Sequence, residues 1–162
     1  MFSDALLSQA RDLLEAARAA NMRIVTAESC TGGLIAALLT EIPGSSDVVE
    51  RGLVTYSNQA KQDLLGVPEE LLRLHGAVSE PVCGAMAQGA LKNAKAQFSI
   101  AVTGIAGPGG GMPDKPVGLV YIAVASHTGN VIVQECRFGD IGRSRVRLQT
   151  VEHAIELLRG CL

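Results

Sequence analysis

Two short segments hold the residues best suited to chemistry, and each directly follows an apolar run typical of a buried strand. The first segment is TAESCTGG, residues 26–33. A strand–turn–helix junction directs backbone N–H groups and the positive end of a helix toward whatever lies in front of it. A hydroxyl held there, on Ser29, could act as a nucleophile. In the alternative, structural role, Ser29 or Thr31 caps the helix, and Gly32 and Gly33 allow close packing.

The second segment is the glycine-rich stretch GIAGPGGG, residues 104–111, which follows the apolar run at 98–103. It is not a Walker A loop, because Lys115 is preceded by Asp114 rather than by glycine, and it does not match the G-x-G-x-x-G pattern. Consecutive glycines can still form a nest of N–H groups for a phosphate or an oxyanion. Its place after a buried strand favours a ligand-binding loop, with a flexible surface loop as the alternative.

A serine nucleophile needs a base, and the three histidines are poorly placed to supply one. His75, His127 and His153 fall in a predicted helix end, a hairpin and a helix, where surface or packing roles are commoner. The base would then be a Lys, Tyr, Asp or Glu. Lys61 qualifies only if it is neutral, and lowering its pKa from about 10.4 to about 7–8 requires burial or a neighbouring cation. Spacing alone favours a solvated helix lysine at this position.

Cys30 is a second candidate nucleophile because it adjoins Ser29. Its flanks supply no histidine partner, and a buried structural thiol is the commoner fate of such a residue. The remaining cysteines are Cys83, Cys136 and Cys161. They form no C-x-x-C pair, and no histidine stands at a metal-ligand spacing from them. We therefore expect no metal site and no disulfide.

The elements that must position these residues alternate between strand and helix. Helical patterns are predicted at 4–20, 34–40, 58–65, 68–75, 79–96 and 144–159, and strands at 23–27, 52–56, 98–103, 118–126 and 130–137. The last two strands adjoin each other and predict a hairpin. The strands are apolar on both sides, so helices should cover both faces of the sheet. We predict a single α/β domain over residues 1–162, a layered α/β/α sandwich with a central mixed sheet.

Composition narrows the function further. Hydrophobic residues make up 48% of the 162, which is enough for a full core, and the net charge is −2. Without a basic excess, and with five aromatic residues in all, sequence-independent nucleic-acid binding is not expected. No segment approaches the ~18 continuous apolar residues of a spanning helix, and charges near the N-terminus interrupt any signal-peptide pattern. We expect a cytoplasmic protein with no membrane partner.

Taken together, five segments resemble the CinA C-terminal domain family of competence/damage-inducible proteins. They are TAESCTGG (26–33), VTYSNQAKQDLLGV (54–67), GAVSE (76–80), AVTGIAGPGGG (101–111) and KPVGLVYIA (115–123). They run in the family's order and cover nearly the whole chain. Stand-alone members of this family are nicotinamide-nucleotide amidases. The resemblance therefore implies deamidation of nicotinamide mononucleotide to nicotinate mononucleotide and ammonia, in the recycling of pyridine nucleotide toward NAD.

The resemblance also implies how the reaction would be carried out. It points to a serine amidohydrolase that needs no metal or cofactor and uses a Ser–Lys pair with a nearby Tyr, roles that fall on Ser29, Lys61 and Tyr56. It further suggests a homo-oligomer acting on a small pyridine mononucleotide. Donors to the developing oxyanion, and contacts to the substrate, would come from the two small-residue segments. The residues expected there are Thr31, Gly32, Thr103, Gly104 and Gly107.

One stretch departs from the family pattern. A short Gly-Asp-Arg sequence usually precedes the final helix, and here it is expanded to GDIGRSR, residues 139–145. Arg143 and Arg145 are therefore both candidates to contact the substrate phosphate, with Arg143 first. Two alternatives to the serine amidase remain. One is a non-catalytic nucleotide-binding, competence-associated module that uses the 104–111 loop as a phosphate nest, and the other is an amidase dependent on Cys30.

Overall fold

The structure, a computed structural model, describes residues 2–162. Five strands form one mixed sheet in the order β2-β1-β3-β4-β5. The strands are β1 (Ile24–Glu28), β2 (Val49–Val54), β3 (Phe98–Gly104), β4 (Leu119–Ser126) and β5 (Val131–Arg137). The helices are α1 (Asp4–Ala19), α2 (Leu34–Thr40), α3 (Asn58–Leu65), α4 (Glu69–His75), α5 (Glu80–Lys92) and α6 (Arg143–Cys161), with a short 3₁₀ turn η1 (Ser45–Asp47).

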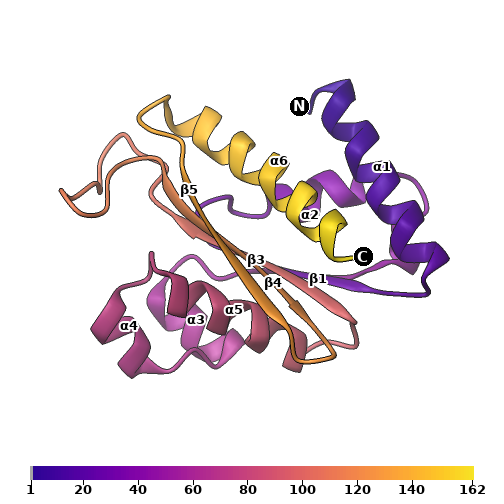
Figure 1. The fold of residues 1–162 in the computed structure, drawn as a ribbon, viewed down its shortest axis with the longest axis horizontal. Helices are drawn as coiled ribbons and strands as arrows, with labels where there is room; N and C mark the ends of the chain where they lie inside the picture. Colours follow the sequence, from indigo (N-terminus) through magenta and orange to yellow (C-terminus); the bar gives the residue numbers. More distant parts are fainter. Residues whose placement is uncertain (1) are drawn as a thin grey trace.

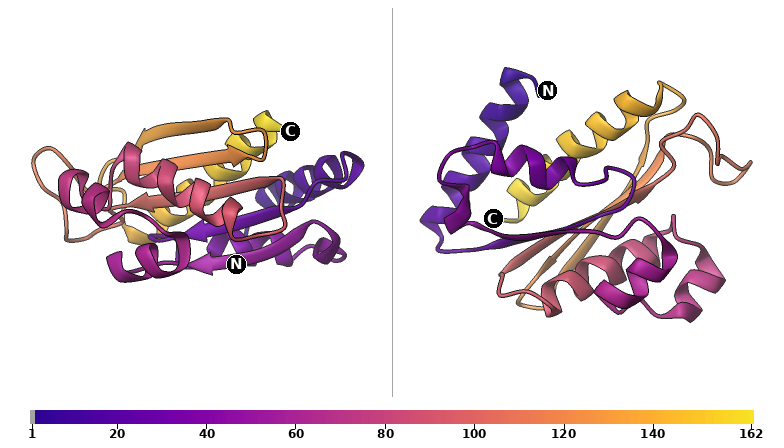
Figure 2. Two further views of the ribbon diagram at one scale, coloured as in Figure 1. Left: turned by 90° about the horizontal axis from the view of Figure 1, so that it is seen from below. Right: turned by 180° about the vertical axis from the view of Figure 1, so that it is seen from behind.

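The sheet lies between two helical layers, as the sequence predicted. Helices α1, α2 and α6 cover one face, and α3, α4 and α5 lie on the other (Figure 1). The two further views in Figure 2 show the same layers from below and from behind. Each layer closes its own apolar core against the sheet. The α/β/α sandwich with a mixed central sheet is therefore confirmed.

The parallel part of the sheet positions the candidate site. Strand β1 pairs in parallel with β2 on one side and with β3 on the other, while β4 and β5 are antiparallel. Every residue of β1 is buried, because the strand has neighbours on both edges and helices on both faces. The carboxyl ends of β1, β2 and β3 consequently meet at one edge of the sheet. In open α/β sheets this edge is where ligands bind.

The observed boundaries differ from the predicted ones in two places that matter. Strand β2 begins at Val49 and ends at Val54, rather than running over 52–56, so Tyr56 lies beyond the strand instead of at its end. Glu50 and Arg51 interrupt the apolar pattern because β2 is an edge strand with a solvated side. Helix α5 ends at Lys92 rather than near residue 96, and Asn93 is its C-cap.

No helix within residues 2–162 combines the length and apolar character needed to span a bilayer.

Candidate active site

Ser29 and Lys61 form a buried pair at the carboxyl end of β1. The Lys61 Nζ lies 3.0 Å from the Ser29 Oγ and donates a second hydrogen bond of 2.9 Å to the Thr55 carbonyl. Ser29 is 8% exposed and Lys61 is 1% exposed. The solvated lysine favoured by spacing alone is therefore wrong, because α3 turns this side chain inward beneath the end of β2. A hydroxyl and an amine at this distance have the geometry of a nucleophile with its base.

Burial also changes the acidity of Lys61. Removing the ammonium from water disfavours the charged form, so the pKa of Lys61 is lowered from its ordinary value near 10.5. The ionisable groups that act on it in the opposite direction are thiols, of Cys30 and Cys83, and no carboxylate is among them. A buried lysine without a carboxylate counter-ion loses its proton more readily than a solvated one. The environment thus favours the amine form that a general base requires.

The turn that carries Ser29 is wound around the carboxylate of Glu28. This buried side chain accepts hydrogen bonds from the hydroxyls of Thr26 and Thr31 and from three backbone N–H groups, those of Gly33, Ile35 and Ala36. The alternative role, in which the side chain of Ser29 or Thr31 caps α2, is therefore wrong. Glu28 accepts the N–H groups at the start of α2, and Thr31 contributes by donating to that carboxylate at 2.6 Å. The Ser29 hydroxyl is left available for Lys61.

Some backbone N–H groups of this turn donate hydrogen bonds within the protein, and others have no acceptor in the described part of the chain. Ser29 N–H donates to the Val102 carbonyl, and Gly32 N–H donates to the Ser29 carbonyl. Among residues 2–162, the N–H groups of Cys30 and Thr31 have no hydrogen-bond acceptor. Cys30 directly follows the candidate nucleophile, a position from which donors to an oxyanion are commonly supplied, and Thr31 comes one residue later.

The second small-residue segment lies beside the first, because the strands that precede them, β3 and β1, are neighbours in the sheet. Ile105 N–H donates to the Leu119 carbonyl, while the N–H groups of Ala106 and Gly107 lack an acceptor in the part of the chain that the structure describes. The Thr103 hydroxyl donates a hydrogen bond of 2.9 Å to the Ala77 carbonyl, which connects β3 to the segment before α5. Gly104 permits a close approach of β4, because a Cβ there would lie 2.6 Å from a Val120 methyl group.

A cavity of about 240 Å³ opens over the Ser29–Lys61 pair. It lies at the carboxyl ends of β1, β2 and β3 and is closed on one side by the start of α6. Its walls are formed by Ser29, Cys30, Tyr56, Asn58, Lys61, Ala77, Val78, Thr103, Gly104, Ala106 and Arg143. The three residues expected to act in catalysis therefore share one cavity with Thr103, Gly104 and Arg143 from the expected substrate-binding set. None of the three histidines lines it.

Arg143, at the first position of α6, bridges the two sides of this cavity. Its Nη1 donates to the Gly107 carbonyl and its Nη2 donates to the Tyr56 hydroxyl, each at 3.0 Å. Tyr56 is 60% exposed, and its hydroxyl contacts Arg143 rather than Ser29 or Lys61. The arginine thus sits at the cavity rim with a cationic group beside the N-terminus of a 19-residue helix, an arrangement that suits an anion.

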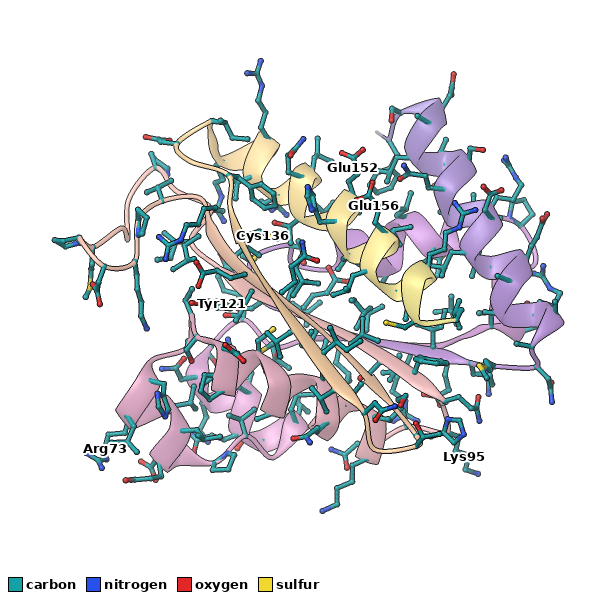
Figure 3. All side chains as sticks on the ribbon, viewed as in Figure 1. Arg73, Lys95, Tyr121, Cys136, Glu152 and Glu156 are labelled. Carbon is teal, nitrogen blue, oxygen red and sulfur yellow. The ribbon has the colours of Figure 1, made fainter. Side chains whose placement is uncertain are left out.

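Arg145, the second arginine expected to contact substrate, is not brought to this cavity. It lines a different hollow between α1 and α6, together with Leu6 and Glu152. Figure 3 labels Glu152, which projects from the side of α6 turned away from the sheet. Of the two candidates, the structure places Arg143 at the rim.

Two residues of the site were missed by sequence reasoning. Glu28 was given no role of its own, although a carboxylate in the turn before a helix is a recognisable signal for capping of backbone N–H groups. Arg147 was overlooked because nothing local marks it. It lies more than a hundred residues after the turn, yet its Nε donates to the Cys30 carbonyl at 3.1 Å and its Nη2 to the Thr31 carbonyl at 2.9 Å.

The thiol of Cys30 is a poor nucleophile in this setting. Burial raises its pKa to about 12, so the reactive thiolate is scarce at neutral pH. Cys83 lies deeper, where its thiol donates to the carbonyls of Ala101 and Tyr121. Within residues 2–162, no three His, Cys, Asp or Glu side chains come together in a way that would hold a metal ion.

Known proteins resemble this chain over its length. It is 47% identical to the nicotinamide-nucleotide amidohydrolase PncC of Escherichia coli strain K12, covering 98% of this chain and 95% of that protein. A competence/damage inducible protein from Agrobacterium tumefaciens has a solved structure that is 52% identical, with a TM-score of 0.97 over 99% of this chain and 97% of that one.

Longer relatives also match. A CinA-like protein of Anaeromyxobacter sp. strain K is 51% identical over 86% of this chain, and the chain spans about a third of that protein's length, 34%. The family model of the CinA C-terminal domain matches residues 7–162. This chain therefore belongs to the CinA C-terminal domain family.

Proposed function

We propose that this protein hydrolyses the carboxamide of nicotinamide mononucleotide, giving nicotinate mononucleotide and ammonia, with Ser29 as the nucleophile and Lys61 as its base. The observation that carries the proposal is the buried contact of 3.0 Å between the Ser29 hydroxyl and the Lys61 amine. The relative named nicotinamide-nucleotide amidohydrolase, which aligns over almost all of both chains, supplies the substrate class.

The first half of the reaction forms an acyl-enzyme. Ser29 Oγ attacks the carboxamide carbon while Lys61 Nζ takes the hydroxyl proton, and the carboxamide oxygen becomes an oxyanion. The free N–H groups of Cys30 and Thr31 would stabilise that charge. The C–N bond then breaks, and the leaving nitrogen receives the proton that Lys61 carries, so ammonia departs as a neutral molecule.

The second half releases the product. A water molecule attacks the ester carbonyl, Lys61 takes a proton from that water, and the tetrahedral intermediate collapses with return of the proton to Ser29 Oγ. Because Lys61 is the base in both halves, its lowered pKa serves both. Nicotinate mononucleotide leaves with its new carboxylate.

The rest of the nucleotide needs different partners. We infer that Arg143 and the adjoining N-terminus of α6 hold the substrate phosphate, because a guanidinium offers two parallel N–H donors to phosphate oxygens. Tyr56 lies next to Arg143 at the exposed rim and reaches neither Ser29 nor Lys61 with its hydroxyl. We therefore assign Tyr56 an orienting role for substrate and Arg143 rather than direct proton transfer.

The test is ammonia release from nicotinamide mononucleotide by the wild-type protein and by two neighbouring variants. Ser29→Ala should lower kcat by at least about 10³-fold, with the fold and the affinity for substrate retained. Cys30→Ala is the matched control and should keep most of the activity. If Cys30→Ala were inactive and Ser29→Ala active, the thiol would be the nucleophile. Binding of the mononucleotide by the wild type without turnover would instead support a non-catalytic nucleotide-binding module.

A further inference from the structure

Arg147 contacts the turn that carries Ser29, residues 28–33, which we call the nucleophile turn. It binds backbone carbonyls that take no part in the proposed catalytic steps. Its side chain extends from the second turn of α6 and is partly buried. Both of its hydrogen bonds go to backbone carbonyls, those of Cys30 and Thr31, at 3.1 and 2.9 Å. It is not among the residues that line the cavity over Ser29. An effect of Arg147 on the reaction would therefore pass through the turn.

These two carbonyls belong to the second and third peptide groups after Ser29, which are Cys30–Thr31 and Thr31–Gly32. The peptide bond between Cys30 and Thr31 is trans, so the Cys30 carbonyl and the Thr31 N–H point in opposite directions from one rigid plane. Holding the carbonyl toward Arg147 therefore holds the Thr31 N–H away from it. That N–H is one of the two in the turn without an acceptor among residues 2–162.

The second bond secures the neighbouring peptide plane. The Thr31 carbonyl shares its plane with Gly32 N–H, which donates to the Ser29 carbonyl at 3.0 Å. Arg147 thus fixes the peptide planes of Cys30–Thr31 and Thr31–Gly32 by binding their carbonyl groups. The Glu28 carboxylate fixes the next part of the turn by accepting from the N–H group of Gly33. A guanidinium suits this task because its donors form a rigid fork, whereas the single ammonium of a lysine would not span two carbonyls in the same way.

The charge of Arg147 strengthens the same effect. A cation hydrogen-bonded to a carbonyl polarises the peptide group, which makes the N–H on its other side a better donor. A donor that is already oriented stabilises an oxyanion without reorganising during the reaction.

We propose that Arg147 is a positioning residue that aims and polarises the Thr31 N–H as a donor to the oxyanion, without itself contacting substrate. The choice of amide substrate rests on the proposed function, whereas the orientation of the donor does not. Removing Arg147 should leave substrate binding intact and weaken the stabilisation of the tetrahedral state. The turn should still form, because the five hydrogen bonds to Glu28 do not involve Arg147.

The first experiment compares Arg147→Met and Arg147→Lys with Arg159→Met, an exposed arginine on the same helix that is paired with Asp12. Loss of one oxyanion donor costs about 10²–10³-fold in kcat, and a donor that is misaimed rather than removed should fall near the lower end. On nicotinamide mononucleotide, Arg147→Met should lose about 10²-fold in kcat with KM changed by less than about threefold. Arg147→Lys should recover little, and Arg159→Met should match the wild type.

The second experiment separates a positioning role from a structural one and does not need the proposed substrate. A fluorophosphonate probe reacts with an activated serine: the Ser29 Oγ–P bond forms, the P–F bond breaks, fluoride leaves and the proton passes to Lys61. The phosphoryl oxygen needs the same donor as the oxyanion. Labelling of Ser29, followed by intact mass, should be slower in Arg147→Met by a factor similar to its loss in kcat, while its melting temperature stays within a few degrees of wild type.

The outcomes distinguish the two proposals. If the wild type labels at Ser29 but releases no ammonia from the mononucleotide, the proposed substrate is wrong and the labelling rates alone decide the role of Arg147. Labelling of Arg147→Met at the wild-type rate overturns the positioning role. So does an increase in KM with kcat unchanged, since that result would place Arg147 in substrate binding.

Discussion

The nucleophile turn, residues 28–33, and the glycine loop, residues 104–111, follow neighbouring parallel strands and yet are built in opposite ways. In the turn, residues from Glu28 through Thr31 are buried. Its backbone is held by hydrogen bonds that the Glu28 carboxylate accepts and by hydrogen bonds that Arg147 donates. In the loop, the base is tied to β4 through Ile105, whereas residues 108–111 are exposed. The turn is held from two sides, whereas the loop is held at Ile105 and by the hydrogen bond from Arg143 to the Gly107 carbonyl, with residues 108–111 left exposed.

The difference separates two tasks at one edge of a sheet. Chemistry at a carboxamide requires a nucleophile, a base and oxyanion donors held within a fraction of an ångström, and a buried turn held by Glu28 and Arg147 is suited to that task. Recognition of a ribose and a phosphate tolerates more adjustment, which an exposed loop of small residues allows. We therefore expect substitutions in or beneath the turn to lower kcat and substitutions at the loop and rim to act through KM.

The largest effect on kcat is expected at Lys61, whose amine contacts the hydroxyl of Ser29 in the turn. Lys61→Arg keeps a cation but cannot supply a neutral base near pH 7, so kcat should fall by at least about 10³-fold. In the wild type, kcat/KM should rise with pH through an apparent pKa below the ordinary lysine value, because burial lowers the pKa of Lys61. Substantial activity in Lys61→Arg would show that charge alone was needed and would place Lys61 outside the chemistry.

The same residue links catalysis to stability. Because the pKa of Lys61 is lower in the folded state than the unfolded value near 10.5, the unfolded chain binds more protons between these two values. The destabilisation is complete below the folded pKa and is relieved as pH rises toward 10.5. Compared with Lys61→Met in urea melts, the wild type should therefore gain stability between pH 7 and pH 10. A difference that does not change with pH would mean that Lys61 is not destabilised by burial.

Sequence reasoning recovered most of the fold because its signals are local. The buried strand at β1, the hairpin of β4 and β5 and the apolar stripe of α1 all follow from the period of the hydrophobic residues. The edge strand β2 was placed three residues late, since Glu50 and Arg51 are tolerated there by solvent. Such errors arise where position in the sheet, rather than the residues themselves, decides the structure.

The candidate site could be predicted less completely, for a physical reason. Ser29 was predicted from its turn and from the family resemblance, but the burial of Lys61 depends on how α3 packs under β2, which spacing does not reveal. The contact of Arg147 with the turn joins residues 117 apart in the sequence, and no local pattern predicts it. Contacts of this kind come from the tertiary structure alone.

The next prediction concerns the rim, where the two arginine candidates can be separated. Arg143→Ala should raise KM for nicotinamide mononucleotide by about 10- to 100-fold, an expected 1.4–2.8 kcal/mol of binding, with kcat nearly unchanged. On the dephosphorylated riboside the same variant should behave as the wild type does. Arg145→Ala should change neither value, because Arg145 lies between α1 and α6.

If both variants kept the wild-type preference for the mononucleotide over the riboside, the phosphate would be held elsewhere. The free N–H groups of Ala106 and Gly107 would then be the next candidates. A fall in kcat for Arg143→Ala would instead mean that the rim contributes to the chemistry, and the division between turn and loop would fail.

A further prediction places the same substitution, glycine to alanine, in both regions. Gly33 in the turn has φ of +99°, a conformation that other residues rarely adopt, so Gly33→Ala should lower the free energy of unfolding by about 1–3 kcal/mol. Gly109 in the loop has no positive φ, and a methyl group added there would meet open space, so Gly109→Ala should be neutral or stabilise by up to about 1 kcal/mol. Urea melts of the two variants measure the difference, and equal losses would show that the loop is as constrained as the turn.

The smallest effect is expected at Thr55, which adjoins the turn through its backbone. Its N–H donates to the Glu28 carbonyl and its carbonyl accepts from Lys61, at 2.8 and 2.9 Å, whereas its buried hydroxyl has no partner among residues 2–162. Thr55→Val keeps both backbone bonds and the branched shape, and it removes a polar group whose burial without a partner costs about 1–3 kcal/mol. The free energy of unfolding should therefore stay the same or rise by about 1 kcal/mol, with kcat within about twofold of wild type.

Thr55→Ser, which keeps the hydroxyl and loses the methyl group, should be the less stable of the two variants. A tenfold fall in kcat for Thr55→Val would contradict this expectation and would make the hydroxyl a participant in proton transfer, acting through a water molecule beside Lys61.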